Sequence, residues 1–130
     1  MAHVLIVDDD PDIRSLIAET LARRNHTIVQ ATDGPTGLAA ARTHLPQVIL
    51  LDWMMPGMSG VELCSVLRAD PIFEHTTIML ITARCEESDR IAGTLAGADA
   101  FIHKPFSLKD LRARVDAVAG SRKPASELAS

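Results

Sequence analysis

Short apolar runs recur five times along the chain, and a segment with helical periodicity follows each of them. Three of the runs are rich in Val, Ile and Leu and have no polar alternation, which is typical of strands that are covered on both faces of a sheet. We therefore expect five strands, at residues 3–7, 27–31, 47–51, 77–81 and 100–102.

Apolar residues spaced three and four apart predict helices between these strands. In the first such segment Ile13, Leu16, Ile17 and Leu21 fall on one stripe, as expected of a helix that packs against a sheet. Residues suited to capping a helix precede several of the segments: they are Asp10 before Pro11, Asp33, Ser59 and Ser107. The predicted helices are 10–24, 34–44, 59–69, 86–97 and 107–119.

The alternation of strand and helix predicts an α/β fold. Five β-α repeats form a doubly wound, five-stranded parallel sheet with helices on both faces. We expect one domain over residues 1–120. The small, polar residues 121–130 are expected to be a flexible tail or the start of a linker.

Composition narrows the classes of function. With 47% hydrophobic residues, the 130-residue chain has enough apolar side chains for one core. A net charge of −4 and only four aromatic residues, three Phe and one Trp, argue against direct nucleic-acid binding by this segment. No apolar run approaches the roughly 20 residues of a membrane span, and the first residues do not resemble a secretory signal. We expect a cytoplasmic protein with free thiols at Cys64 and Cys85.

Polar residues that could bind a ligand or take part in catalysis follow four of the five predicted strands. Asp8 and Asp9 follow the first, Asp52 the third, Thr82 the fourth and Lys104 the fifth. Ligands of such sheets bind at the carboxyl ends of the strands. If the first and third strands are neighbours, carboxylates about 4 Å apart repel by roughly 4 kcal/mol at an effective dielectric constant of 20.

A proton or a cation is needed to relieve this repulsion. Hard oxygen ligands with room for water suit Mg²⁺, and a carboxylate beside a metal ion and a lysine suits acyl or phosphoryl transfer. Asp52 alone has a simpler interpretation as a helix cap, but Ser59 is the better cap for the helix that follows.

Four motifs in order resemble the receiver domain of two-component response regulators, which has the flavodoxin-like (βα)5 fold. They are VDDD at 7–10, DWMMPGMSG at 52–60, TA at 82–83 and KPF at 104–106. The resemblance covers roughly residues 2–119. It implies a cytoplasmic bacterial signalling domain that catalyses only its own phosphoryl transfer and dephosphorylation, rather than an enzyme with turnover.

The resemblance also implies a role for individual residues. Asp52 is similar to the phosphoacceptor, which takes a phosphoryl group from a histidine kinase or a phosphotransfer protein. Asp9, Asp52 and the backbone carbonyl of Met54 match direct Mg²⁺ ligands, and Asp8 matches the acid that holds the metal through water.

The implied switch residues lie nearer the end of the chain. Thr82 matches the hydroxyl that turns toward the phosphoryl group, Lys104 matches the lysine that pairs with it, and the Lys104–Pro105 bond is often cis in the family. Phe101 occupies the place of the aromatic residue that rotates inward, although the commoner residue is tyrosine. The predicted output face is the helix at 86–97, the strand at 100–102 and the helix at 107–119.

The sequence does not identify the output partner. Residues 107–123 carry five basic side chains against two acidic ones, which suits a partner-binding face or a phosphorylation-dependent homodimer. A solvated helix with a basic tail explains the same charges equally well. The chain is either a stand-alone regulator or the receiver of a longer protein.

A phosphatase of the haloacid-dehalogenase type is the alternative from the enzyme class. Its nucleophile is the first acid of an Asp-x-Asp pair after the first strand, which would be Asp8 with Asp10. Pro11 and Asp12 follow in place of the expected residues. A nucleotide-binding site is not indicated, because the chain has neither G-x-G-x-x-G nor a P-loop.

Overall fold

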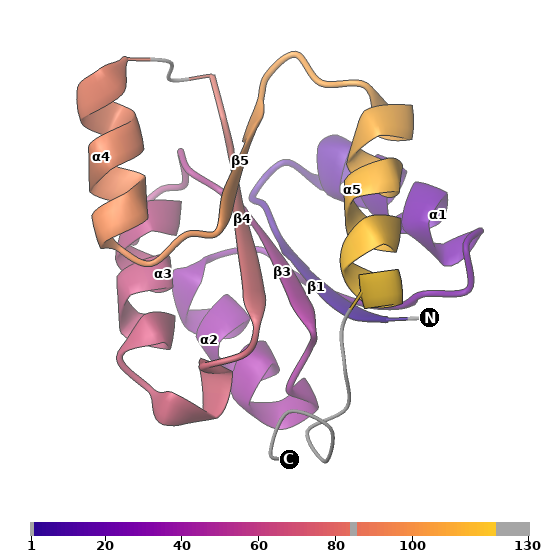
Figure 1. Cartoon of the computed structure of the whole chain (residues 1–130), viewed down its shortest axis with the longest axis horizontal. Coiled ribbons are helices and arrows are strands. Elements are labelled where there is room, and N and C mark those ends of the chain that lie inside the picture. The colour runs from indigo at the N-terminus through magenta and orange to yellow at the C-terminus, as the bar shows by residue number, and fades with distance from the viewer. Residues whose placement is uncertain (1, 84–85, 122–130) are drawn as a thin grey trace.

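The computed structural model describes residues 2–83 and 86–121. Five parallel strands form one sheet in the order β2-β1-β3-β4-β5 (Figure 1). This confirms the doubly wound fold and makes the first and third strands neighbours. The strands are β1 (His3–Val7), β2 (Thr27–Ala31), β3 (Val48–Asp52), β4 (Thr77–Thr82) and β5 (Ala100–His103).

Helices cover both faces of this sheet. α1 and α5 lie on one face, and α2, α3 and α4 lie on the other (Figure 1). A 3₁₀ turn, η1 (Pro71–Phe73), follows α3, at a proline where the sequence indicated only a helix end. The helices are α1 (Pro11–Ala22), α2 (Gly34–His44), α3 (Gly60–Arg68), α4 (Glu87–Leu95) and α5 (Leu108–Ser121). None of the helices in the part of the chain that the structure describes has the length and apolarity to cross a bilayer.

The central strand β3 is buried along its whole length. Its side chains alternate between two cores, with Ile49 and Leu51 facing α2 and α3, and Val48 and Leu50 facing α1 and α5. An uninterrupted apolar run was therefore the correct sign of a strand covered on both faces. The strand ends one residue later than predicted, so Asp52 is its last residue.

The amphipathic stripe of α1 is narrower than predicted. Ile17 and Leu21 are fully buried, whereas Leu16 is 51% exposed. Consecutive helical residues point about 100° apart, and α1 lies on the sheet with Ile17 at the centre of its contact.

Side-chain caps begin the helices where the sequence placed them. Asp10 accepts a hydrogen bond from the backbone N–H of Asp12 at 2.9 Å. Asp33 and Ser59 each form a capping box with the residue three positions later. The hydroxyl of Ser107 accepts from the N–H of Asp110 at 3.2 Å. These caps fix where each strand-to-helix loop ends.

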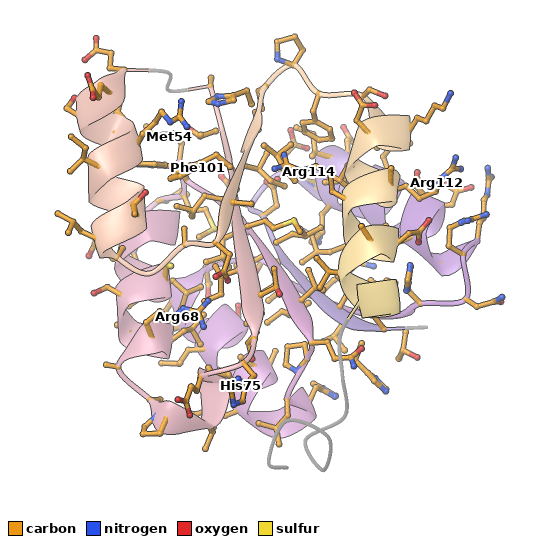
Figure 2. All side chains as sticks on the ribbon, viewed as in Figure 1. Met54, Arg68, His75, Phe101, Arg112 and Arg114 are labelled. Atoms are coloured by element: carbon orange, nitrogen blue, oxygen red, sulfur yellow. The ribbon has the colours of Figure 1, made fainter. Side chains whose placement is uncertain are left out.

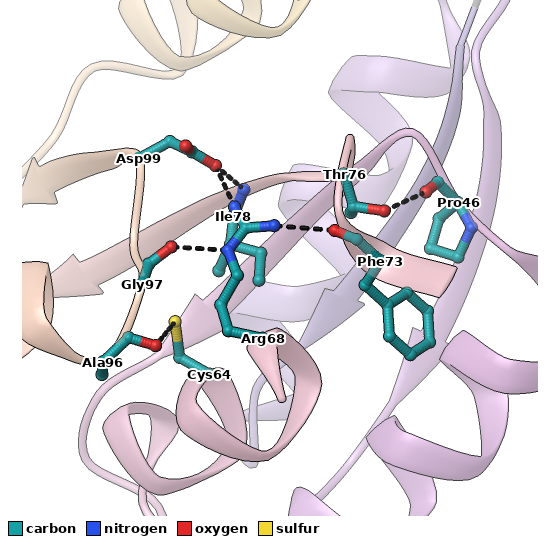
Figure 3. Close-up of polar contacts among 9 residues, drawn as sticks. All are labelled: Pro46, Cys64, Arg68, Phe73, Thr76, Ile78, Ala96, Gly97 and Asp99. Carbon is teal, nitrogen blue, oxygen red and sulfur yellow. Dashed lines mark hydrogen bonds and ion pairs between the residues drawn. The ribbon is translucent and has the colours of Figure 1, made fainter. Parts of the chain in front are cut away.

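Arg68 ties together the loops at the amino ends of β4 and β5 (Figure 3). Its guanidinium donates to the carbonyl oxygens of Gly97 and Phe73, both at 2.7 Å, and to the carboxylate of Asp99. Asp99 in turn accepts from the N–H of Ile78 at 2.8 Å. This end of the sheet is therefore closed by a connected set of hydrogen bonds.

A buried histidine performs a similar task beside β1 and β2. The Nδ1 atom of His26 accepts from the N–H of Ala2 at 3.0 Å, and its Nε2 atom lies 2.7 Å from the carboxylate of Asp116 in α5. Arg24 also donates to Asp116, at 3.1 Å, and these bonds hold the pKa of Asp116 below its usual value despite partial burial. α5 is thereby anchored to the amino end of the sheet.

We predict that Gly60→Ala lowers the free energy of unfolding by about 1–3 kcal/mol. The N–H of Gly60 donates to the carbonyl of Trp53, and a Cβ atom at position 60 would lie 2.3 Å from the backbone oxygen of Asp52. Chemical denaturation measures the change. The matched control is Gly120→Ala, because a Cβ atom there meets nothing within 4 Å, and equal stability of both variants would contradict the prediction.

We predict that Arg68→Met costs about 2 kcal/mol or more, because it leaves partly buried carbonyl oxygens without donors. Arg23→Met is the control, since Arg23 is exposed and pairs only with exposed Glu19 in the structure. Thermal and denaturant unfolding of both variants tests this. A loss no larger than that of the control would show that the Arg68 contacts add little.

Candidate functional site

The strand order brings acidic residues together at the carboxyl ends of β1 and β3. Val7 pairs with Leu51 across these two strands, so Asp8 and Asp52 follow at the same level of the sheet. Oxygen atoms of Asp8, Asp9 and Asp52, one from each carboxylate, all lie within 4.8 Å of one another. Asp8 and Asp52 are buried, whereas Asp9 is exposed at the rim. The structure thus brings these three predicted site residues together.

The carboxylate of Asp8 is only half satisfied. Its Oδ1 atom accepts from the N–H of Asp10 at 2.9 Å. Among residues 2–83 and 86–121, its Oδ2 atom is the only buried side-chain nitrogen or oxygen without a hydrogen-bond partner. A buried carboxylate oxygen without a partner is costly, and in this position it suits a cation ligand.

Lys104 reaches the same cluster from β5. Its Nζ atom lies 3.1 Å from Oδ1 of Asp52. The backbone N–H of Lys104 donates to the carbonyl of Thr82 at 2.8 Å, and the Lys104–Pro105 bond is cis. Because β4 lies between β3 and β5 in the sheet, the side chain crosses the end of β4 to meet the acid that ends β3.

Burial and crowding disturb the titration of the two buried acids. Burial, reinforced by the charges of Asp52 and Asp9, raises the pKa of Asp8 to about 6, against the hydrogen bond from Asp10 and the charge of Lys104. Burial also raises the pKa of Asp52, against the opposing effect of Lys104. When ionised, three carboxylates face one ammonium group, which leaves two negative charges.

The donor set fits a small divalent cation. The available atoms are carboxylate oxygens, which Mg²⁺ prefers, and the exposed position of Asp9 leaves one side open for water ligands. The unpartnered Oδ2 atom of Asp8 supports the same interpretation. Asp9, Asp52 and Asp8 are thus the described side chains that could hold such an ion.

Thr82 and Phe101 occupy the neighbouring strands. Thr82 is the last residue of β4 and is buried. Phe101 in β5 extends toward α4 (Figure 2), where a Cβ atom on Gly93 would lie 2.5 Å from its ring. The ring is therefore partly buried against the helix. Met54, two residues after Asp52, is 60% exposed at the mouth of the site.

Sequence reasoning did not single out Arg14, which the structure places beside the acids. Its Nη1 atom donates to the backbone oxygen of Asp8 at 2.8 Å. The available signal was weak: a basic residue beside Ile13 in the apolar stripe, four positions after the Asp10 cap.

Comparison with known proteins identifies the family of this domain. The family model of the response regulator receiver domain matches residues 4–116. The phosphate regulon transcriptional regulatory protein PhoB of Pseudomonas aeruginosa is 41% identical over 115 residues, which are 88% of this chain and 50% of that protein. PhoB of Escherichia coli is 37% identical over 116 residues, which are 89% of this chain and 51% of that protein. The chain therefore spans about half the length of these relatives.

Solved structures give the same result over the whole fold. The chemotaxis protein CheY4 of Vibrio cholerae has a TM-score of 0.86 and 31% identity, covering 91% of this chain and 98% of that one. The receiver domain of the Francisella response regulator 1452 has a TM-score of 0.87 and 31% identity, covering 95% and 100%. These matches give no support to the phosphatase alternative. The chain belongs to the response regulator receiver domain family of bacterial two-component systems, and it is a phosphorylation-dependent signalling switch.

Proposed function

We propose that Asp52 is the phosphoacceptor, and that it receives its phosphoryl group from a phosphohistidine on a sensor kinase or a phosphotransfer protein. The observation that carries this proposal is the pairing of Asp52 with Lys104 at 3.1 Å within the cluster of Asp8 and Asp9. Of these three carboxylates, Asp52 is the one that ends the central strand. Its backbone pairs with Ile81 of β4, and the residue before it, Leu51, pairs with Val7 of β1.

In the proposed transfer, an oxygen of Asp52 attacks phosphorus. The P–O bond forms as the P–N bond of phosphohistidine breaks, and the imidazole leaves with the bonding electrons and takes up a proton. Lys104 supplies a positive charge beside the oxygens of the transferred group, and the buried setting of Asp52 limits competing water. Asp8, Asp9, Asp52 and the Met54 carbonyl would hold Mg²⁺, which when bound neutralises negative charge on the phosphoryl group.

Phosphoryl transfer to Asp52 requires that positive charge offset the neighbouring carboxylates. Coulomb repulsion from Asp8 and Asp9 opposes the approach of an anionic donor, and the ammonium group of Lys104, which lies 3.1 Å from Asp52, offsets part of it. A divalent ion neutralises this net charge of two negative units. The proposed metal therefore makes both the resting site and the transfer electrostatically favourable.

We propose further that phosphorylation shifts Thr82 and Phe101 and is transmitted through α4, β5 and α5. Exposed Ile91 and Leu95 on α4 give this face apolar contact area for a partner or a second copy of the chain. Arg114 of α5 donates to the backbone oxygen of Phe101 at 2.7 Å, which ties α5 to the same strand (Figure 2). Arg122 and Lys123, which contribute to the predicted basic character of this face, lie outside the described residues.

The remaining expectations belong to the same proposal. We propose a cytoplasmic protein that acts through a partner or output domain rather than by turnover of a substrate. The boundary at residue 120 stays a prediction, because nearly all of the tail at 121–130 lies outside the described residues. Cys85 lies outside them as well, and Cys64 is a buried free thiol whose pKa burial raises to about 11.

The phosphoacceptor assignment predicts a single labelled residue. With Mg²⁺ and a small acyl phosphate, the protein should gain the mass of one phosphoryl group, which peptide mapping should locate at Asp52. Asp52→Asn should abolish the gain, and Asp110→Asn, at an exposed acid, should not. Label on Asp8, or steady release of phosphate that survives Asp52→Asn, would favour the phosphatase alternative.

The raised pKa of Asp8 predicts how pH and Mg²⁺ act on stability. Between the ordinary value of 3.8 and about 6, the folded protein binds a proton that the unfolded chain does not. Without Mg²⁺, the contribution of this acid to the free energy of unfolding is therefore complete below the lower value and is lost as the pH rises through about 6.

Mg²⁺ must displace that proton, so its stabilising effect should grow over the same pH range. At about 100 times its Kd, Mg²⁺ stabilises the fold by about 2.7 kcal/mol, and we expect the full effect at about pH 7.5 and little of it at about pH 5. Thermal unfolding with and without Mg²⁺ measures both trends. Asp8→Asn should weaken the pH dependence and Asp110→Asn should preserve it; an Mg²⁺ effect that is independent of pH would contradict this prediction.

A further inference from the structure

Arg14 connects α1 to the backbone of the acidic cluster. Its Nη1 atom donates to the carbonyl oxygen of Asp8 at 2.8 Å, and its Nε atom donates to the side-chain oxygen of Gln30 at 3.2 Å. Gln30 belongs to β2, so the guanidinium spans from the second strand to the end of the first. Arg14 is itself half-buried.

This contact completes the immobilisation of Asp8. The N–H of Asp8 donates to the carbonyl of Ala31 at 3.2 Å, its carbonyl accepts from Arg14, and its Oδ1 atom accepts from Asp10. Only the buried Oδ2 atom remains without a partner. The hydrogen bonds of the N–H, the carbonyl and the Oδ1 atom therefore determine the position of the Oδ2 atom.

The same contact acts on Asp9 through the peptide bond. The carbonyl of Asp8 and the N–H of Asp9 belong to one planar unit. Arg14 therefore sets the orientation of the plane from which Asp9 continues. Asp9 is exposed, so its placement depends on its backbone more than on side-chain packing.

Arg14 binds a backbone oxygen and leaves the carboxylate of Asp8 free. An arginine paired with the carboxylate itself would compete with a cation for the same oxygens. With the guanidinium on the carbonyl, Asp8 is fixed while its negative charge stays available to a metal ion.

We infer that Arg14 is a positioning residue for divalent-cation binding, which holds Asp8 and Asp9 in the geometry that the ion requires. This inference deepens the proposed function and depends on its metal site. The partners that orient metal ligands contribute about 10–100-fold to metal affinity, so loss of Arg14 should raise the Kd for Mg²⁺ about tenfold or more.

The opposite change in the Kd for Mg²⁺ is expected if Arg14 acts only through its charge. A positive charge near the site repels Mg²⁺, so its removal would lower the Kd. A purely structural role would lower the melting temperature but leave the Kd of the folded protein unchanged. The direction of the change in Kd therefore separates the three explanations.

Isothermal titration with Mg²⁺ alone, without a phosphodonor, tests the inference on the full chain. Arg14→Met and Arg14→Lys should both raise the Kd, with Arg14→Lys closer to the original protein because it keeps one donor. Gln30→Leu, which removes only the second anchor of the guanidinium, should give a smaller rise and provides a milder variant that keeps the contact to Asp8. Arg23→Met, at the exposed residue that follows the same helix, is the matched control and should leave the Kd unchanged.

An unchanged or lower Kd for Arg14→Met in folded protein, verified by circular dichroism, would overturn the inference. Absence of Mg²⁺ binding by the original protein would overturn it together with the proposed metal site. Normal Mg²⁺ binding without label on Asp52 would instead overturn the phosphoacceptor assignment alone, and a raised Kd for the Arg14 variants would still support the inference.

Discussion

Repulsion among acids at one end of the sheet is the constraint around which this domain is arranged. Asp8 and Asp52 are buried and close together because β1 and β3 are neighbours, and Asp9 adds a third carboxylate at the rim. Lys104 offsets part of this charge, and burial, together with the charges of Asp52 and Asp9, raises the pKa of Asp8. A fold that only needed stability would not keep such a group, since ordinary apolar side chains fill this level of a sheet at no electrostatic cost.

The other end of the sheet shows the contrast. There, Arg68 is bonded to Asp99 and to two carbonyl oxygens, and His26 links Ala2 to Asp116. Buried polar groups with complete hydrogen bonds rigidify a structure. The amino end of the sheet thus supplies order, which allows the carboxyl end to hold an acid with an unpartnered oxygen.

This division explains how a small domain serves as a switch. The site needs precise placement of oxygen atoms, and it obtains this from the backbone of β1 and β3 and from the cap at Asp10. The elements of the predicted output face are less completely packed. Phe101 is only partly buried, and α4 has no side-chain cap and carries exposed Ile91 and Leu95. Segments of lower local stability are the ones that respond to a change in charge.

The sequence alone determined the order of elements and the chemical character of the site. Uninterrupted Val, Ile and Leu runs are typical of strands covered on both faces of a sheet, and caps such as Asp10 and Ser59 act on the nearest backbone, so both can be recognised locally. Asp8, Asp9, Asp52 and Lys104 were predicted together because parallel strands place their carboxyl ends at one edge. The ends of strands were predicted less well: β3 ends at Asp52, β4 at Thr82 and β5 at His103, each one residue beyond the predicted strand.

Only the tertiary structure decided which atoms meet. The bond from Arg14 to the carbonyl of Asp8 and that from His26 to the N–H of Ala2 join segments whose approach depends on the packing of whole elements. The exposure of Leu16 depends on how α1 rolls on the sheet, which its apolar stripe does not specify. Backbone donors and acceptors are alike along every chain, so a side chain that binds one has no partner that the sequence can reveal.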